Sequence, residues 1–187
     1  MRFIMRTTPG WDTTEYSKVI PQLELCVDQA KDAYQNFLNA LELAGTEPCV
    51  HLEDDIVLCK NFVQRVSAEV EARPNEVIQF FSARKKDDLE IGSRHILGND
   101  FRFCQCFYLP ANIGLELLEY GKKWSEHPLY PQKYPVSANY DLMMAYFFHS
   151  KKMRYWNVIP NLVDHKPVQS RIDPKRSTQR RSFTFNE

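Results

Sequence analysis

An apolar stretch interrupted by three consecutive acids constrains the fold of this chain most. Residues 49–62 carry the β-branched and other apolar side chains typical of a buried strand. Glu53, Asp54 and Asp55 fall in the middle of this stretch. Three like charges beside a buried strand are costly unless a cation offsets their desolvation and repulsion. The pattern therefore predicts either a divalent-metal site, because hard cations prefer oxygen ligands, or a strand that ends in water with its acids solvated.

Helix and strand patterns alternate along the chain. Short apolar runs outside the acidic stretch predict strands at residues 2–6, 23–27, 77–81, 101–109 and 153–159. Apolar spacing of three and four residues predicts helices at 15–20, 30–44, 62–73, 110–121 and 139–147. Segments 82–99 and 124–135 lack clear periodicity and are expected to be irregular. The alternation predicts an α/β domain whose sheet is mostly parallel.

Composition fits one globular domain of 187 residues, with 43% hydrophobic and 26% charged side chains. Six of the 24 Lys and Arg but two of the 24 Asp and Glu lie in residues 166–187, which predicts a body at 1–165 and a basic tail at 166–187. No apolar targeting core begins the chain, and no apolar run reaches the roughly 20 residues that span a bilayer. The five cysteines are expected to be free, buried thiols. Together these features predict a cytoplasmic protein.

Four features occur along the chain in a recognisable order. A helix containing Asn36 precedes the acidic stretch, Leu-Glu-Asp-Asp follows at 52–55, Asn-Tyr-Asp-Leu starts a late helix at 139–142, and Pro-Asn-Leu-Val-Asp-His closes the series at 160–165. This order resembles the GT-A fold family of nucleotide-sugar glycosyltransferases, in the compact form found in phages and bacteria. Residues 52–55 are similar to the family's Asp-x-Asp motif, with Glu in the first place. The resemblance spans most of the chain.

The resemblance implies a single-domain, Rossmann-like GT-A fold and transfer of a sugar from a nucleoside-diphosphate sugar to an acceptor hydroxyl. It also implies Mn²⁺ or Mg²⁺, which stabilises the charge that grows on the leaving diphosphate. Asp55 is the expected direct ligand, and Glu53, two residues away on the same strand face, is a second expected ligand. His165 would complete the metal shell or contact a phosphate.

Further residues receive expected roles from the same resemblance. Asp141 is the expected base for the acceptor hydroxyl. Residues expected to contact the nucleotide or its sugar are Arg6, Thr7, Asp28, Asn36, Asp54 and Ser170. Aromatic rings stack on sugars and bases, so Trp124, Tyr130 and Tyr134 are expected acceptor contacts. The acceptor itself stays open between modified phage DNA, a saccharide and a protein.

Simpler interpretations stand beside these roles. Asp28 and Asn139 are suitable helix caps, and Asp141 in a first helical turn favours the helix dipole without catalytic duty. The basic residues of the tail, Arg171, Lys175, Arg176, Arg180 and Arg181, suit a solvated end, a flap over a diphosphate or a contact to a polyanion.

Two other functions fit the same residues. A metal-dependent phosphoesterase or nucleotidyltransferase would also use Glu53, Asp55 and His165. A non-catalytic nucleotide-sugar-binding module is the second alternative.

Overall fold

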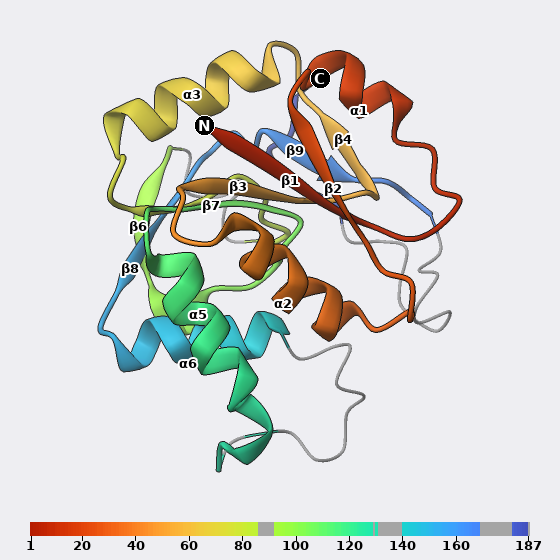
Figure 1. The fold of residues 1–187 in the computed structure, drawn as a ribbon. Coiled ribbons are helices and arrows are strands. Elements are labelled where there is room, and N and C mark those ends of the chain that lie inside the picture. Colours follow the sequence, from red (N-terminus) through yellow and green to blue (C-terminus); the bar gives the residue numbers. More distant parts are fainter. Residues whose placement is uncertain (86–91, 129, 131–139, 169–180, 187) are drawn as a thin grey trace.

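A mixed seven-stranded sheet forms the centre of the computed structural model, which describes residues 1–85, 92–128, 130, 140–168 and 181–186 (Figure 1). The strand order is β2-β1-β3-β7-β5-β8-β6, and β4 pairs with β9 in a separate two-stranded sheet. The strands are β1 Arg2–Thr7, β2 Leu23–Val27, β3 Cys49–Glu53, β4 Ile56–Leu58, β5 Val77–Gln79, β6 Arg94–Leu97, β7 Cys106–Leu109, β8 Arg154–Asn157 and β9 Val163–His165. The helices are α1 Thr14–Val19, α2 Ala33–Ala44, α3 Phe62–Ala72, α5 Ile113–Lys122 and α6 Tyr140–Ser150, with short 3-10 turns η1 Gly98–Asp100 and η2 Trp124–Glu126.

Five of the seven strands in the central sheet run in the same direction. β1 is parallel to β2 and β3, and β5 is parallel to β8. β7 runs against both of its neighbours, and β6 runs against β8. The predicted mixed, mostly parallel, Rossmann-like sheet is confirmed. The carboxyl ends of β1, β2 and β3 therefore meet along one edge, where open α/β sheets bind ligands.

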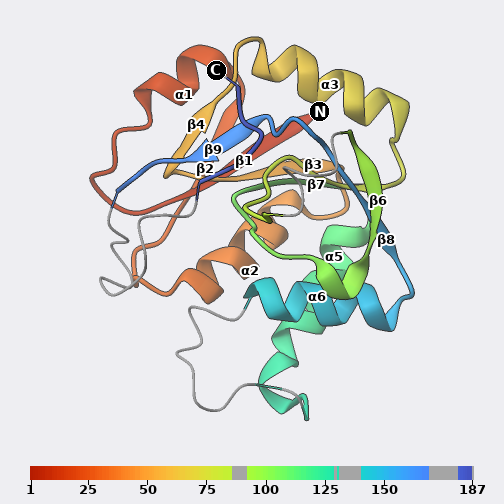
Figure 2. The same cartoon turned by 180° about the vertical axis from the view of Figure 1, so that it is seen from behind.

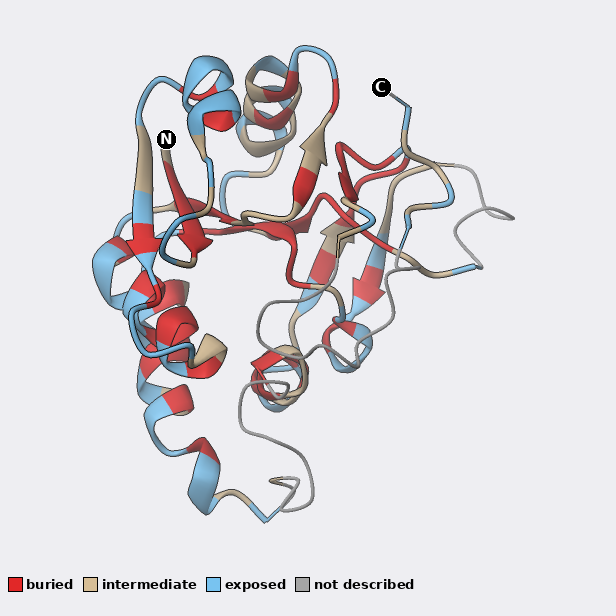
Figure 3. Cartoon of the chain, turned by 90° about the vertical axis from the view of Figure 1, so that its right-hand side faces the viewer, coloured by how far each residue is buried: buried red, intermediate tan, exposed pale blue. Residues whose placement is uncertain are grey.

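Helices cover both faces of the sheet. α1 and α3 lie on one face, and α2, α5 and α6 lie on the other (Figures 1 and 2). Side chains alternate between the faces along each strand. Val50 and Leu52 of β3 pack toward α1 and α3, whereas His51 stacks on Phe107 on the opposite face. Figure 3 shows the resulting pattern, with buried residues along the sheet and on the inner helix sides. None of the helices in the described residues is long and apolar enough to cross a membrane.

Helix α2 leads the chain into the acidic stretch and begins three residues later than expected. The Asp32 carboxylate accepts hydrogen bonds from the backbone N–H groups of Tyr34 and Gln35, which satisfies two donors at the helix start. Gly45, with φ of 61°, ends the helix as predicted. Its buried face includes Phe37, whose ring stacks on that of Tyr140.

The acidic stretch is two strands, and the first of them, β3, ends at Glu53, in agreement with the predicted strand that ends in acids. Half-buried Asp54 and Asp55 form a turn between β3 and β4, because a central strand cannot continue through charges that need water or a cation. After this turn the chain leaves the main sheet. β4 pairs with β9 in antiparallel register, with Ile56 opposite His165.

Two further segments differ from the sequence-based expectation. Segment 82–99, expected to be irregular, contains β6, which pairs with β8 at the sheet edge. The strand expected at 101–109 shortens to β7, since Phe103 adopts a left-handed φ of 68° just before it. All five cysteines are buried and free, as expected.

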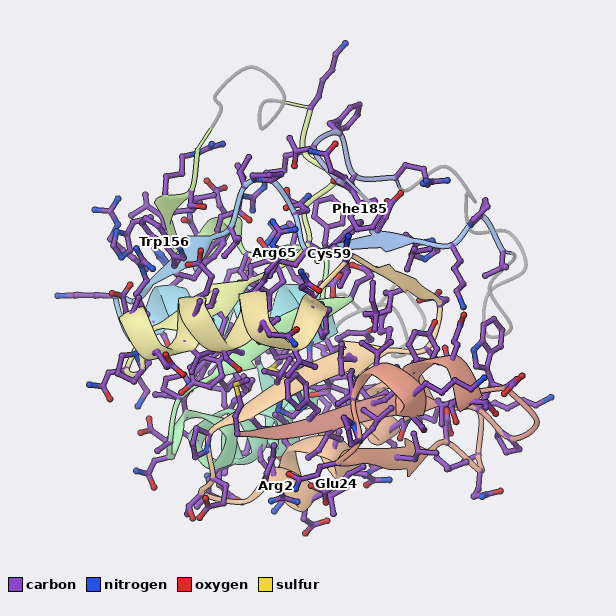
Figure 4. The ribbon with its side chains drawn as sticks, turned by 90° about the horizontal axis from the view of Figure 1, so that it is seen from above. Arg2, Glu24, Cys59, Arg65, Trp156 and Phe185 are labelled. Carbon is purple, nitrogen blue, oxygen red and sulfur yellow. The ribbon has the colours of Figure 1, made fainter. Side chains whose placement is uncertain are left out.

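Part of the expected basic tail folds back on the body. Ser182 and Thr184 bond to Asn161, and Phe185 packs against the apolar cluster beneath α1 and α3 (Figure 4). The interval 169–180 lies outside the described residues.

Candidate functional site

The structure brings most of the predicted site residues to the carboxyl edge of β1, β2 and β3. Arg6 lies next to Cys26 of β2 and Glu53 of β3 in the sheet register. The Asp28 N–H, just beyond β2, donates a 2.8 Å hydrogen bond to the Thr7 carbonyl. The edge therefore gathers the residues for which the sequence predicts ligand contacts.

The first acid of the motif, Glu53, forms a largely buried ion pair with Arg6. Arg6 Nη2 lies 3.3 Å from Glu53 Oε1 and donates a 2.7 Å bond to the Cys104 carbonyl. The guanidinium also lies 5.1 Å and 5.0 Å from the ring centres of Phe37 and Tyr140. Such contacts favour the cation when it is removed from water. Arg6 thus offsets the Glu53 charge from inside the protein.

The first residue of α6 reaches the same carboxylate. The Tyr140 hydroxyl donates to Glu53 Oε1, and its ring stacks on Phe37 with centres 5.0 Å apart. Burial, and next the nearby Glu53 charge, raise the pKa of Tyr140. Asp141 lies close enough to the Cys104 thiol to raise its pKa beyond the effect of burial. The predicted base therefore lies beside Cys104, whose carbonyl oxygen accepts a hydrogen bond from Arg6. Tyr140 was not predicted from the sequence, where it is one aromatic among several in a helix pattern.

The middle acid ties the turn to β1. Asp54 Oδ2 accepts from the Thr7 hydroxyl at 2.7 Å and from the Thr8 N–H at 3.3 Å. The Tyr16 hydroxyl lies 2.6 Å from the Asp54 carbonyl oxygen. Burial raises the pKa of Asp54 to about 6, and the neighbouring Asp55 adds to this rise while the Thr7 bond opposes it. Asp54 thus holds the shape of the turn in addition to any ligand contact.

The third acid meets His165 across the two-stranded sheet. His165 Nε2 lies 3.0 Å from Asp55 Oδ2, and His165 Nδ1 lies 2.7 Å from the Lys166 carbonyl oxygen. A carbonyl oxygen can only accept, so Nδ1 must donate to it. In neutral His165 the Nε2 lone pair would then face a carboxylate oxygen. Two acceptors at this distance require a shared proton or a shared cation.

This pair fits a divalent cation as two of its ligands. Two oxygen or nitrogen ligands roughly 2.1 Å from one octahedral ion lie about 3 Å apart when they are adjacent. A metal-binding histidine also usually donates its other ring N–H to a carbonyl or carboxylate, as His165 does. Within the described part of the chain, no group of three His, Cys, Asp or Glu side chains is placed to hold an ion. The remaining ligands would have to be substrate and water oxygens.

Glu53, an expected metal ligand, has protein partners at one of its two carboxylate oxygens. Its Oε1 is engaged by Arg6 and Tyr140, and it is directed toward α6, while Asp55 pairs with β9. Residues two apart share a strand face only while the strand continues, and here β3 ends at Glu53. The alternation that linked Glu53 to Asp55 breaks at the turn.

Asp28 combines a structural and a potential binding role. Its Oδ1 accepts from the N–H groups of Ala30 and Asp32, which shapes the loop before α2. Asp32, not Asp28, caps the helix. Asp28 is 4% exposed, and its Oδ2 has no hydrogen-bond partner among the residues that the structure describes. An unsatisfied buried carboxylate oxygen suits a ligand that donates N–H or O–H.

The remaining predicted contacts divide between the core and segments outside the described residues. The Asn36 amide oxygen accepts from the Cys26 thiol at 3.0 Å, a contact between α2 and β2. Trp124 is 1% exposed, so its ring packs inside the protein and is not the stacking surface that was expected. Tyr130 is half-buried against Trp124, with ring centres 6.2 Å apart. Tyr134 and Ser170 lie outside the described residues.

Comparisons with known proteins assign the chain to no family. No protein-family model matches the chain, and no curated protein matches it. One similar solved structure is described as the crystal structure of A197 from STIV. It is 15% identical, covers 88% of this chain and 85% of its own, and gives a TM-score of 0.46.

Proposed function

We propose that the protein is a metal-dependent glycosyltransferase that moves a sugar from a nucleoside-diphosphate sugar to an acceptor hydroxyl. The observation that carries the proposal is the Asp55–His165 pair, in which Asp55 Oδ2 and His165 Nε2 are 3.0 Å apart. It lies beside the carboxyl edge of β1 and β3, where a nucleotide is expected in an open α/β sheet. The order of motifs that resembles GT-A enzymes supports the sugar nucleotide as substrate.

The proposed chemistry divides among three groups of residues. Asp55 and His165 would hold Mn²⁺ or Mg²⁺, which when bound neutralises the charge on the leaving diphosphate. The Asp28 Oδ2 atom would accept a hydrogen bond from a base N–H or a ribose hydroxyl. Asp141 would accept the proton of the acceptor hydroxyl as that oxygen attacks the sugar carbon.

Ligand-dependent melting tests the donor and metal together. The protein would be heated with a panel of nucleoside diphosphates and nucleotide sugars, with and without Mn²⁺. A ligand at about 100 times its dissociation constant adds about 2.7 kcal/mol, enough to raise the midpoint by a few degrees. We expect a rise that needs both metal and one nucleotide and that disappears in Asp55→Ala.

Glu119→Ala is the matched control for Asp55→Ala. Glu119 is an exposed carboxylate paired with Lys122 on α5, and its loss should leave the ligand-dependent rise unchanged. The absence of any metal-dependent rise with every donor would contradict the proposal.

The released product separates the proposal from its alternatives. A glycosyltransferase releases a nucleoside diphosphate, whereas a phosphoesterase or nucleotidyltransferase releases phosphate or pyrophosphate. A binding module would show the thermal shift and release neither. Hydrolysis of the donor, followed by chromatography of the nucleotide, distinguishes these products even before the acceptor is known.

A further inference from the structure

One carboxylate joins three elements at the site edge. Glu53 ends β3, Arg6 comes from β1, and Tyr140 is the first residue of α6. Arg6 is 5% exposed, Tyr140 is 6% exposed, and the Glu53 side chain is 16% exposed. In this mostly dry environment the two hydrogen bonds to Glu53 are stronger and more directional than they would be in water.

The Tyr140 hydroxyl adds a hydrogen bond that the packing of its ring does not require. Its ring already stacks on Phe37 and lies over the Arg6 guanidinium, and phenylalanine would fill the same space. The hydroxyl supplies a bond to one atom, Glu53 Oε1, and so sets both the position of the helix start and its rotation.

Rotation of the helix start decides where Asp141 points. Successive helical residues are about 100° apart around the axis, so fixing Tyr140 fixes the direction of its neighbour. Asp141 then lies beside Cys104, whose carbonyl also accepts from Arg6. One turn later, Met144 Sδ lies 3.3 Å from the Cys104 thiol, which provides a second contact for the same turn.

We infer that Tyr140 is a positioning residue that acts through Glu53, and that the unit Arg6–Glu53–Tyr140 holds Asp141 at the reacting edge. Glu53 is then a positioning carboxylate and not a ligand of the metal. The catalytic consequence rests on the proposed function, whereas the anchoring of α6 can be tested without it.

Kinetics of Tyr140→Phe test the catalytic consequence. If Asp141 is held less firmly, kcat should fall, because small misplacements of a catalytic group lower rates by up to about 100-fold. We expect kcat to fall roughly 10- to 100-fold, with the donor KM within about threefold of wild type. Tyr120→Phe is the matched control, because the buried Tyr120 hydroxyl has no hydrogen-bond partner within the described residues. Equal kcat values for the two variants would overturn the inference.

Mn²⁺ binding tests the role assigned to Glu53. Titration calorimetry with Mn²⁺ and the nucleoside diphosphate should give Glu53→Gln an affinity within about threefold of wild type, and Asp55→Asn a loss of 10-fold or more. If Glu53→Gln loses as much affinity as Asp55→Asn, then Glu53 is a ligand and the inference fails.

Hydrogen exchange tests the anchor independently of activity. In Tyr140→Phe, amides in the peptide spanning α6 should exchange about 10-fold faster than in wild type, while those of α3 keep their rates. Unchanged α6 exchange would refute the anchor. If wild-type protein shows no transfer but the α6 exchange rises as expected, the proposed function fails while the anchor is supported.

Discussion

Arg6 and His51 lie on neighbouring strands and are both buried, but Arg6 is charged and His51 is neutral. Arg6 is charged, with a carboxylate, a carbonyl and two aromatic rings around it. His51 is fully buried, and neither ring nitrogen has a hydrogen-bond partner in the part of the chain that the structure describes. Burial, and next the charges of Arg6 and Arg2, lower the pKa of His51 from 6.5 to about 3. It is therefore neutral in the folded protein above about pH 3.

His51 should make the protein less stable in acid. Below pH 6.5 the unfolded chain binds a proton at this position and the folded chain does not, so the free energy of unfolding falls as pH drops toward 3. At about 1.4 kcal/mol for each pKa unit, the loss is at most about 5 kcal/mol. Urea unfolding of His51→Leu between pH 4 and 7 should show a shallower pH slope than wild type.

The control is His149→Leu, which removes an exposed histidine from the end of α6. It should keep the wild-type slope. A slope unchanged in His51→Leu would show that His51 is protonated, or reaches water, in the folded protein.

Two ion pairs on β1 offer a comparison of buried and exposed charges. Arg6–Glu53 has side-chain exposures of 5% and 16%, whereas Arg2–Glu24 has 32% and 38% and lies at an outer edge (Figure 4). Arg6→Met leaves a largely buried carboxylate without its cation and should cost about 3–5 kcal/mol. Arg2→Met should cost about 0–1 kcal/mol. Denaturant unfolding measures both, and equal costs would mean that water reaches Glu53.

At the scale of single residues, the sequence predicted which residues lie at the candidate site better than it predicted which side chains they contact. The acidic motif indicated a charge that had to be offset, and Asp55 does meet His165. That the offset for Glu53 comes from Arg6 and Tyr140 could not be predicted. Tyr140 is 87 positions from Glu53, and their contact depends on how α6 packs against the sheet.

At the scale of elements, close approaches between helices and turns depend on two glycines. A Cβ on Gly98 of η1 would lie 2.5 Å from Phe148 Cβ and 2.8 Å from the Met153 carbonyl oxygen. A Cβ on Gly121 of α5 would lie 2.6 Å from Leu38 Cδ2, the far end of a flexible side chain.

Gly98→Ala should therefore destabilise the protein more than Gly121→Ala. The atoms near Gly98 belong to backbone or Cβ and cannot rotate away, so we expect a loss of about 2–3 kcal/mol, against about 1 kcal/mol or less at Gly121, where alanine also improves helix propensity. Thermal unfolding of both variants measures the difference. The reverse order would mean that η1 moves away from α6 more easily than Leu38 changes rotamer.

Most elements were predicted from the sequence, with errors where pairing decides the outcome. Apolar periodicity found α2, α3, α5 and α6, and Gly45 marked the end of α2, because these signals are local. β6 was missed because its four residues become a strand only by pairing with β8. β4 was not predicted as a separate strand because it gains its hydrogen bonds from β9, which lies more than 100 residues later.

At the scale of the whole molecule, the fold class followed from alternating helices and strands, but the strand order did not. The antiparallel β7 lies between β3 and β5, a placement that local patterns do not encode. The two-stranded sheet that unites Asp55 with His165 is likewise a long-range result. The candidate site could be predicted as a set of residues, but its division into the Asp55–His165 pair and the Arg6–Glu53–Tyr140 unit required the structure.

The returning segment 181–186 should contribute to global stability through Asp164. This carboxylate is 2% exposed and accepts from the His165 and Ser182 N–H groups at 2.8 Å and 2.7 Å, and Arg181 pairs with it. Deleting 181–187 removes two of these donors from a buried charge and should cost about 2–3 kcal/mol in urea unfolding.

A double-mutant cycle checks the origin of that cost. The same deletion in an Asp164→Asn background should cost at least about 1 kcal/mol less, because the charge that needs the donors is gone. Identical costs in both backgrounds would show that the deletion acts through lost packing of Phe185 instead.

The returning segment also has a practical consequence for handling the protein. Phe185 is half-buried against the apolar cluster beneath α1 and α3, and Thr184 bonds to Asn161, so these two residues contact the segment that leads into β9. An affinity tag or fluorescent fusion attached directly after them would disturb these contacts, which lie close to the strand that carries His165. Labels for binding assays are better attached ahead of β1 or separated from residue 187 by a long glycine–serine spacer.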